Sequence, residues 1–397
     1  MVSVNEADNV IGASLLGLGT EAIPLAGAMG RVLKQAVVAD RDFPPFNRVM
    51  MDGIAIQFAA WEKGVREFVV EGLSAAGTPQ KTLTGSDGCL EVMTGAVMPA
   101  NADTVVKYEE VTLNGGKAVI RAGHQVKPGQ HVHLQGADRQ LGAVLLAADR
   151  VLGPAEIAVL ATVGRVEVTV ARSPRVAVIA TGDELVEIEA MPLPHQIRKS
   201  NVHALVAALQ AHKFVAKAFH LLDDKAQIRQ GLKEILANYD AVVLSGGVSK
   251  GKLDFVPEIL AELGVEKLFH FVAQRPGKPF WFGRYKKAVV FALPGNPVSS
   301  FVGLTRYVVP FLYRSAGVEP KAPKAVLAED FTFKPNLTYF LQVKLHFDDH
   351  GRLLATPAPG QGSGDLANLP EADAFLELPQ GKDTFKAGEV FPCWGYR

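Results

Sequence analysis

The chain has 397 residues, enough for several domains that each bury a core of their own. Hydrophobic residues make up 48% and charged residues 21%, which is typical of a globular protein and excludes a disordered one. Its 41 basic residues balance 41 acidic ones, so no net positive field attracts a nucleic acid or an anionic bilayer, and any anion must be bound locally.

The first apolar stretch, residues 10–29, does not have the pattern of a signal peptide, because Glu6 and Asp8 precede it and the first basic residue is Arg31. No other apolar run approaches the ~18 residues that a membrane-spanning helix needs. Cys89 and Cys393 are far apart and form no CxxC pattern, which fits a reducing compartment. We therefore expect a cytoplasmic protein without a membrane segment.

Short β-like runs separated by glycine and proline fill residues 20–172 and predict a β-rich region. One helix is expected within it, over residues 154–162, because Pro154 suits a first helical position. Ser173 and Pro174 then mark a boundary, at which the pattern of the sequence changes.

Apolar runs alternate with amphipathic segments from RVAVIATG at residue 175 to about Arg314. This rhythm predicts a mostly parallel sheet covered by helices. Asn296 is expected to cap the last helix, with Pro297 in its first turn. Residues 317–325 have the composition of a linker, and the short strands beyond them predict a small all-β module.

Ligands of open parallel sheets bind at the carboxyl ends of the strands, so the residues after each predicted strand are candidates for ligand binding. Three such segments, TGDE from Thr181, SGGVS from Ser245 and LPGNP from Leu293, are expected to converge on one edge. The glycine-rich segment could cradle a phosphate with its backbone amides, although Gly-Gly after a strand is also a common tight turn.

The same segment nearly matches a Walker A motif, with Gly246, Gly251 and Lys252 at the required spacing. Leu253 stands where that motif needs the hydroxyl ligand of magnesium, which weakens the hypothesis of a P-loop phosphotransferase dependent on Lys252.

Two cations, Arg275 and Lys278, flank a Pro-Gly turn and could contact an oxyanion, although a solvated basic turn is the simpler interpretation. Carboxylates at turns could together hold magnesium, which prefers oxygen ligands. For two of them, at the starts of predicted helices, a helix cap is the stronger interpretation when each is taken alone. These carboxylates are Asp52, Glu184, Asp224 and Asp254, of which the last two are the expected caps.

The ordered set of segments resembles the molybdopterin molybdenumtransferases, the MoeA family, which includes the E domain of gephyrin and plant molybdenum insertases. The resemblance covers nearly the whole chain. It is carried by RDFPPFNRVMMDGIAI, TGAVMPANADTVVKYEEV, VKPGQHVHLQGADRQLGAVL, VAVIATGDELVE, IRKSNVHAL, DAVVLSGGVSKGKLDFV, RPGKPFWFG, LPGNPVSSF and GQGSGDLANLPEADAFLELP.

The resemblance implies an elongated homodimer of multidomain α/β plus β subunits. Each subunit would have a β-rich linker domain (residues 1–38 with 140–172), an inserted β-rich lobe (39–139), a MogA-like molybdopterin-binding α/β domain (173–316) and a small C-terminal β-barrel (317–397). The extreme N-terminal helix would pack on the α/β domain.

The resemblance also implies an activity: adenylylated molybdopterin and molybdate give molybdenum cofactor and AMP, with magnesium assisting in a cleft between subunits. Partners would include a molybdopterin adenylyltransferase and factors that mature molybdoenzymes. By motif match the catalytic residues are Asp52, Glu184, Asp224, Asp254 and Lys278, with Asp52, Glu184 and Asp254 as the metal set. The expected ligand-binding residues are Thr181, Ser245, Gly246, Gly247, Ser249, Arg275, Pro294, Asn296, Ser299 and Ser363.

This chain departs from the family pattern at Val49, His133 and Ala137, where polar residues are usual, and at Lys252, which replaces an acid. Asp138 still matches an aspartate of the family. These departures leave open a second hypothesis, a non-catalytic molybdopterin-binding paralogue or scaffold.

Overall fold

The structure is a computed structural model, and it describes residues 1–248 and 255–397. The chain forms two compact units. The first comprises Met1–Gln35, Ala148–Ile157 and Val166–Arg397, and the second comprises Ala36–Ala147 and Ala158–Arg165.

A six-stranded sheet is the centre of the first unit. Its four consecutive neighbours β18, β15, β19 and β23 run parallel, and β22 and β20 continue the sheet antiparallel, so the expected mostly parallel sheet is confirmed. The strands in spatial order are β18 (Ala216–Leu221), β15 (Val176–Thr181), β19 (Ala241–Ser245), β23 (Ala288–Leu293), β22 (Trp281–Tyr285) and β20 (Glu266–His270).

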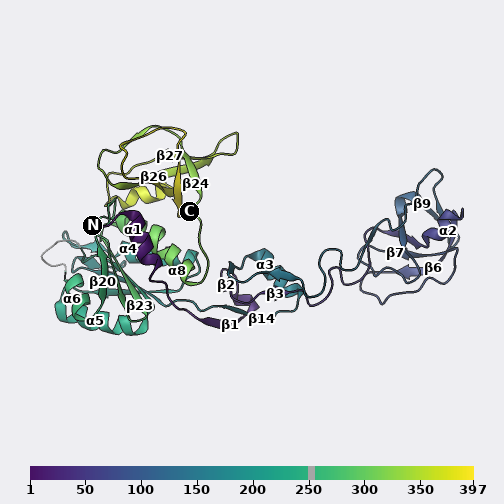
Figure 1. Ribbon diagram of the computed structural model, residues 1–397, viewed down its shortest axis with the longest axis horizontal. Coiled ribbons are helices and arrows are strands. Elements are labelled where there is room, and N and C mark those ends of the chain that lie inside the picture. Colours follow the sequence, from purple (N-terminus) through teal and green to yellow (C-terminus); the bar gives the residue numbers. More distant parts are fainter. Residues whose placement is uncertain (249–254) are drawn as a thin grey trace. The chain divides into compact units, whose positions relative to one another are not determined.

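Helices cover both faces of this sheet (Figure 1). Along β15, Val176 and Val178 pack toward one face while Ala177 and Ile179 pack toward the other, and all four are buried. Burial on both faces explains why the strand is a continuous apolar run. One face is covered by α5 (Lys225–Asn238) and α6 (Val256–Glu262), and the other by α1 (Val4–Gly12), α4 (Ser200–Ala211), α7 (Pro297–Gly303) and α8 (Val309–Ser315).

The last helical stretch of the α/β region, expected to end near Arg314, ends at Ser315 but is not uniform. A π-helical segment, Leu304–Val308, joins α7 to α8. Pro310 lies in the first turn of α8, two residues after this segment, and has no backbone N–H to donate, so regular α-helical pairing is interrupted in this region. Segments of π-helix are rare and often lie near functional sites.

The C-terminal part forms a closed five-stranded barrel, as expected. The ring runs β26, β27, β24, β30, β28 and back to β26, and β21 (Gln274–Arg275) adds in parallel to β26. Buried side chains such as Leu341, Leu376 and Cys393 fill the barrel. Its strands are β24 (Lys324–Leu327), β26 (Thr338–Phe347), β27 (Leu353–Pro357), β28 (Ala374–Leu378) and β30 (Val390–Gly395), beside a small ladder of β25 (Phe331–Thr332) and β29 (Thr384–Phe385).

The N-terminal helix α1 is tied to the α/β region by ion pairs. Asp8 contacts Arg314 at 2.8 Å and Arg306 at 3.3 Å, and Arg306 also contacts Glu377 of the barrel at 2.8 Å. The first unit also holds a four-stranded sheet of β1 (Thr20–Pro24), β14 (Glu167–Ala171), β2 (Val32–Leu33) and β13 (Arg150–Val151), and a two-stranded ladder of β16 (Leu185–Val186) and β17 (Ile197–Arg198).

The second unit is built on another six-stranded sheet. Its strands in spatial order are β8 (Thr104–Lys107), β5 (Gly53–Ile56), β7 (Gly88–Val92), β6 (Glu67–Ser74), β10 (Lys117–Ile120) and β9 (Val111–Asn114). Two short ladders pair β3 (Val37–Val38) with β12 (Val144–Leu146) and β4 (Arg48–Val49) with β11 (Val132–His133), and α2 spans Phe58–Glu62. The expected helix α3 occupies Pro154–Thr162, where the sequence places it.

Among the described residues, no helix has the length and hydrophobicity to cross a membrane.

Candidate functional site

The ends of three neighbouring parallel strands border one cavity of the first unit. β15 ends at Thr181, β19 at Ser245 and β23 at Leu293, so the loops that follow them meet at one edge. The first cavity, as we call it, has a volume of about 710 Å³. The structure thereby brings together seven of the expected residues, namely Thr181, Glu184, Ser245, Gly246, Gly247, Pro294 and Asn296.

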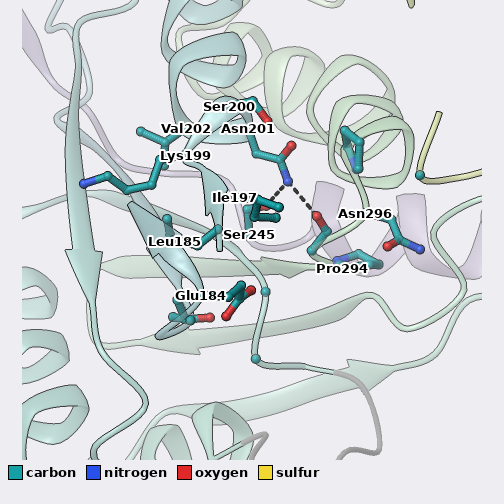
Figure 2. Close-up of a pocket in the computed structure, with 18 of the residues that line it drawn as sticks. Glu184, Leu185, Ile197, Lys199, Ser200, Asn201, Val202, Ser245, Pro294 and Asn296 are labelled. Carbon is teal, nitrogen blue, oxygen red and sulfur yellow. Dashed lines mark hydrogen bonds between the residues drawn. The ribbon is translucent and has the colours of Figure 1, made fainter. Parts of the chain in front are cut away.

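Asn201, which the sequence did not single out, joins two of these loops. Its side-chain Nδ2 donates to Ser245 Oγ at 3.0 Å and to the carbonyl oxygen of Gly295 at 2.6 Å (Figure 2). The residue lies in the first turn of α4, which begins at Ser200. The only signal in the sequence is its position in the first turn of a helix of the α/β region, since ligands of such sheets bind at the carboxyl ends of the strands.

The glycine loop packs closely against Thr181. A Cβ added to Gly246 would lie 2.8 Å from Thr181 Oγ1, and one added to Gly247 would lie 3.0 Å from it, so larger residues do not fit. Thr181 Oγ1 is buried and has no hydrogen-bond partner among the described residues. The Gly246 amide donates to the Leu293 carbonyl at 3.0 Å, so this N–H belongs to the sheet and is not a donor to a ligand.

A carboxylate borders the cavity from the loop after β15. The Glu184 side chain folds back over Gly182, where an added Cβ would lie 2.4 Å from Glu184 Oε2. Gly182 also has a φ of +139°, a backbone conformation that residues with a side chain rarely adopt. Lys199 also lines the cavity, but its amino group pairs with Glu187 and points away from Asn201 (Figure 2).

Asp223 and Asp224 follow β18, and the structure places them differently. Asp223 lines the first cavity, whereas Asp224 caps α5 by accepting a hydrogen bond from the Gln227 amide at 2.8 Å. The capping interpretation of Asp224 is therefore confirmed. The sequence alone did not distinguish these adjacent carboxylates.

A second cavity of about 370 Å³ adjoins the first and shares Pro279, Pro294 and Asn296 with it. Besides Pro294 and Asn296, four expected residues line it: Arg275, Lys278, Ser299 and Ser363. Both cationic side chains are exposed, and within residues 1–248 and 255–397 neither forms an ion pair with a carboxylate. Their charge is therefore available to an anion.

A loop of the barrel closes one side of the second cavity. Asn296 is at the N-cap position of α7, but its side chain does not cap the helix as expected and instead donates from Nδ2 to Ser363 Oγ at 2.8 Å. The Val298 amide of the first turn donates to the Ser363 carbonyl at 3.1 Å. The barrel loop thus satisfies the donor of α7 that a capping side chain would have served.

Asp52 lies in the second unit, at the turn before β5. Its Oδ1 accepts hydrogen bonds from Thr94 Oγ1 at 2.7 Å and from the Thr94 amide at 2.6 Å, and these bonds lower the pKa of Asp52. The carboxylate is therefore ionised at neutral pH.

Three of the positions at which the chain departs from the family pattern, Val49, His133 and Ala137, also lie in the second unit. Val49 is buried in β4. His133 bridges Arg48 and Asp138, with its Nε2 3.0 Å from Asp138 Oδ1 and its Nδ1 3.1 Å from the Arg48 guanidinium. Because an arginine can only donate, His133 Nδ1 accepts and Nε2 carries the proton.

Three further expectations fall outside the described residues: Ser249, Lys252 and Asp254. Within the described residues there is no group of three or more histidine, cysteine, aspartate or glutamate side chains close enough to hold a metal ion. The free cysteines Cys89 and Cys393 are both buried.

Three family models match consecutive parts of the chain. They are described as the MoeA N-terminal region (domain I and II), over residues 2–164, a probable molybdopterin binding domain, over residues 177–314, and the MoeA C-terminal region (domain IV), over residues 324–394.

Full-length relatives agree with these matches. A Synechocystis protein named molybdopterin molybdenumtransferase is 42% identical over 400 residues and covers 100% of both chains. A Bacillus subtilis protein of the same name is 33% identical over 383 residues, covering 94% of this chain and 88% of its own. The crystal structure of a molybdopterin biosynthesis MoeA protein from a Pyrococcus species has a TM-score of 0.83 at 31% identity, covering 100% of this chain and 99% of its own.

An α/β domain with its cavity at the strand ends, joined to β-rich regions and a C-terminal barrel, is a fold of the molybdopterin-binding class. Within that class, the chain belongs to the family of molybdopterin molybdenumtransferases.

Proposed function

We propose that the protein inserts molybdenum during biosynthesis of the molybdenum cofactor, converting adenylylated molybdopterin and molybdate to molybdenum cofactor and AMP. The observation that carries this proposal is the pair of adjoining cavities, one at the strand ends and one lined by two exposed cations that pair with no carboxylate of residues 1–248 and 255–397. Relatives that match over the full length of the chain are named for this transferase activity, and nothing favours a non-catalytic paralogue.

The adenylylated pterin would occupy the first cavity. Its volume of about 710 Å³ falls within the range of small-molecule sites. The Thr181 hydroxyl, which has no hydrogen-bond partner in the part of the chain that the structure describes, is available to an oxygen of the phosphate linkage. The small residues Gly246 and Gly247 let the ligand approach the backbone. Ser245, held by Asn201, would contribute a second hydroxyl.

Molybdate would bind in the second cavity. A dianion and a phosphate linkage repel each other, and this repulsion grows as water leaves the site. Arg275 and Lys278 would offset that repulsion through charge-assisted hydrogen bonds, with the hydroxyls of Ser299 and Ser363 completing the shell. Asn296 and Pro294 line both cavities, so the two substrates would meet beside them.

The first cavity suits magnesium, because two residues with carboxylate side chains, Glu184 and Asp223, line it. Magnesium, when bound, would neutralise charge on the phosphate linkage. Glu184 and Asp223 would hold it, and Asp52 and Asp254 remain proposed members of the set. The role proposed for Asp52 depends on a homodimer, whose active cleft would lie between subunits.

We further expect the protein to work in the cytoplasm, to receive its pterin from a molybdopterin adenylyltransferase and to pass the product to factors that mature molybdoenzymes. These expectations rest on the family resemblance.

AMP release from adenylylated molybdopterin tests the proposal. Purified protein supplied with molybdate and magnesium should release AMP, and Glu184→Gln should release it at least tenfold more slowly, since electrostatic groups at reacting centres contribute roughly that much or more. Glu189→Gln is the matched control, because Glu189 is exposed and lies outside both cavities. Tight binding of the pterin without AMP release would contradict the proposal and support a scaffold.

A further inference from the structure

A buried glutamine holds the turn that carries the two cations of the second cavity. Gln274 is 1% exposed, and its Nε2 donates to the carbonyl oxygens of Pro276 at 3.1 Å and of Gly277 at 3.4 Å. These carbonyls belong to the turn between Arg275 and Lys278. Because a buried carbonyl needs a partner, the two hydrogen bonds fix the peptide planes of this turn.

Gln274 is itself fixed from the other side by Tyr307. The Tyr307 hydroxyl donates to Gln274 Oε1, and Tyr307 is fully buried in the π-helical segment Leu304–Val308. Burial raises the pKa of Tyr307, so its hydroxyl keeps the proton that it donates. Both ends of the Gln274 amide are thus engaged, and the group cannot rotate without losing a hydrogen bond.

The packing around this pair leaves little freedom. Gly277 has a φ of +88°, and a Cβ there would lie 2.8 Å from Gln274 Nε2. The Tyr307 ring packs against Phe280, with 5.1 Å between ring centroids, at the end of the same turn. The conformation of the turn therefore depends on its hydrogen bonds to Gln274 and on the packing of Tyr307 against Gln274 and Phe280.

This arrangement matters for an anion in the second cavity. The negative ends of the Pro276 and Gly277 carbonyl dipoles are engaged by the Gln274 amide, so they do not oppose the positive field of Arg275 and Lys278. We propose that Gln274 and Tyr307 are positioning residues for the oxyanion site of the second cavity. This inference rests on the proposed function, which places molybdate there.

Tyr307→Phe removes the hydroxyl alone and is the sharpest test, and Gln274→Met removes the amide at similar volume. For both variants, the Kd of molybdate measured by titration calorimetry should rise roughly five- to thirty-fold, the equivalent of one or two hydrogen bonds. The Kd of adenylylated molybdopterin should stay within about twofold, because its cavity is a different one. In turnover, the KM for molybdate should rise while the KM for the pterin does not.

Tyr313→Phe is the matched control, since Tyr313 lies on the adjoining helix α8 and its hydroxyl is near His212, away from the turn. It should leave both affinities unchanged. Wild-type affinity for molybdate in Tyr307→Phe would overturn the inference, as would an equal loss of both ligands in that variant.

Two variants distinguish a failure of this inference from a failure of the proposed function, which places molybdate in the second cavity. Arg275→Ala and Lys278→Ala should weaken molybdate binding if the second cavity holds the oxyanion. If they do so and Tyr307→Phe does not, only the positioning role is wrong. If the wild-type protein binds no molybdate, the proposed function and this inference are both wrong.

Discussion

Arg306 and Glu377 form an ion pair at 2.8 Å in which the arginine side chain is 8% exposed and the glutamate side chain 14% exposed. The pair joins the π-helical segment of the α/β region to strand β28 of the barrel. Trp394 also donates from Nε1 to the same Glu377 oxygen at 2.7 Å, and the Arg306 guanidinium lies 4.5 Å from the Trp394 ring centroid.

Glu377→Ala should therefore destabilise the first unit strongly. The substitution leaves the buried Arg306 with only its longer contact to Asp8 at 3.3 Å and leaves Trp394 Nε1 without its acceptor, and breaking a buried pair in this way costs up to about 3–5 kcal/mol. The midpoint of urea unfolding should fall accordingly. Glu371→Ala is the control, because its pair with Lys344 at 3.6 Å is exposed and such pairs contribute about 0–1 kcal/mol. Equal effects of the two substitutions would show that the buried pair has no special role.

Thr181→Val should change stability and binding in different directions. The valine has nearly the same shape and removes a buried hydroxyl without a partner among the described residues, so the free energy of unfolding should stay constant or rise by about 1 kcal/mol. Binding of adenylylated molybdopterin should weaken roughly tenfold, because the ligand loses a hydrogen bond.

Thr104→Val is the matched control for this substitution. Thr104 is also buried, but its hydroxyl accepts from the Gly129 amide at 3.1 Å, so the valine should lower stability. A Thr181→Val variant that loses stability as Thr104→Val does would mean that the Thr181 hydroxyl has a structural partner.

Asn201→Ala should loosen the strand-end loops. Without the amide, Ser245 Oγ and the Gly295 carbonyl lose a common donor, and we expect the Kd of adenylylated molybdopterin to rise about tenfold. Asn238→Ala serves as comparison, since its amide reaches only the Glu234 carbonyl within α5, outside both cavities. Unchanged pterin binding in Asn201→Ala would exclude a role for this link.

Thr94→Val should raise the pKa of Asp52, because the Thr94 hydroxyl is the largest cause that lowers it. A carboxyl whose pKa is lower in the folded state contributes stability that is present above its unfolded pKa, about 3.9, and is lost as the pH falls through its folded pKa. The stability difference between wild type and Thr94→Val should therefore be present near neutral pH and vanish in acid. NMR titration of the Asp52 carboxyl measures the shift directly, and Thr94→Ser, which keeps the hydroxyl, should titrate like wild type.

The sequence predicts most of this fold because burial leaves a clear pattern in it. The continuous apolar runs of β15, β19 and β23 are buried on both faces, which identifies parallel strands and places their carboxyl ends at one edge. From that, Thr181 and Ser245 could be named as neighbours.

What the sequence does not reveal is where individual side chains turn. Asp223 and Asp224 are adjacent and chemically identical, and only the exact start of α5 decides which one caps the helix and which one faces the cavity. Asn296 has the residue type and position of a cap, yet it bonds to Ser363, 67 residues further along the chain. The contact between Gln274 and Tyr307 likewise depends on tertiary packing, which no local pattern encodes.

Arg306 and Tyr307 are neighbours in the π-helical segment, but their side chains contact different parts of the molecule. Arg306 reaches Glu377 of the barrel, and Tyr307 reaches Gln274 beside the turn that carries the two cations. Each residue of a helix turns the chain by a fixed angle, which is about 100° in an α-helix. Losing or gaining a single residue between Leu304 and Val308 would therefore rotate these two side chains away from both targets at once. In this stretch a change of length should be far more harmful than a change of residue type.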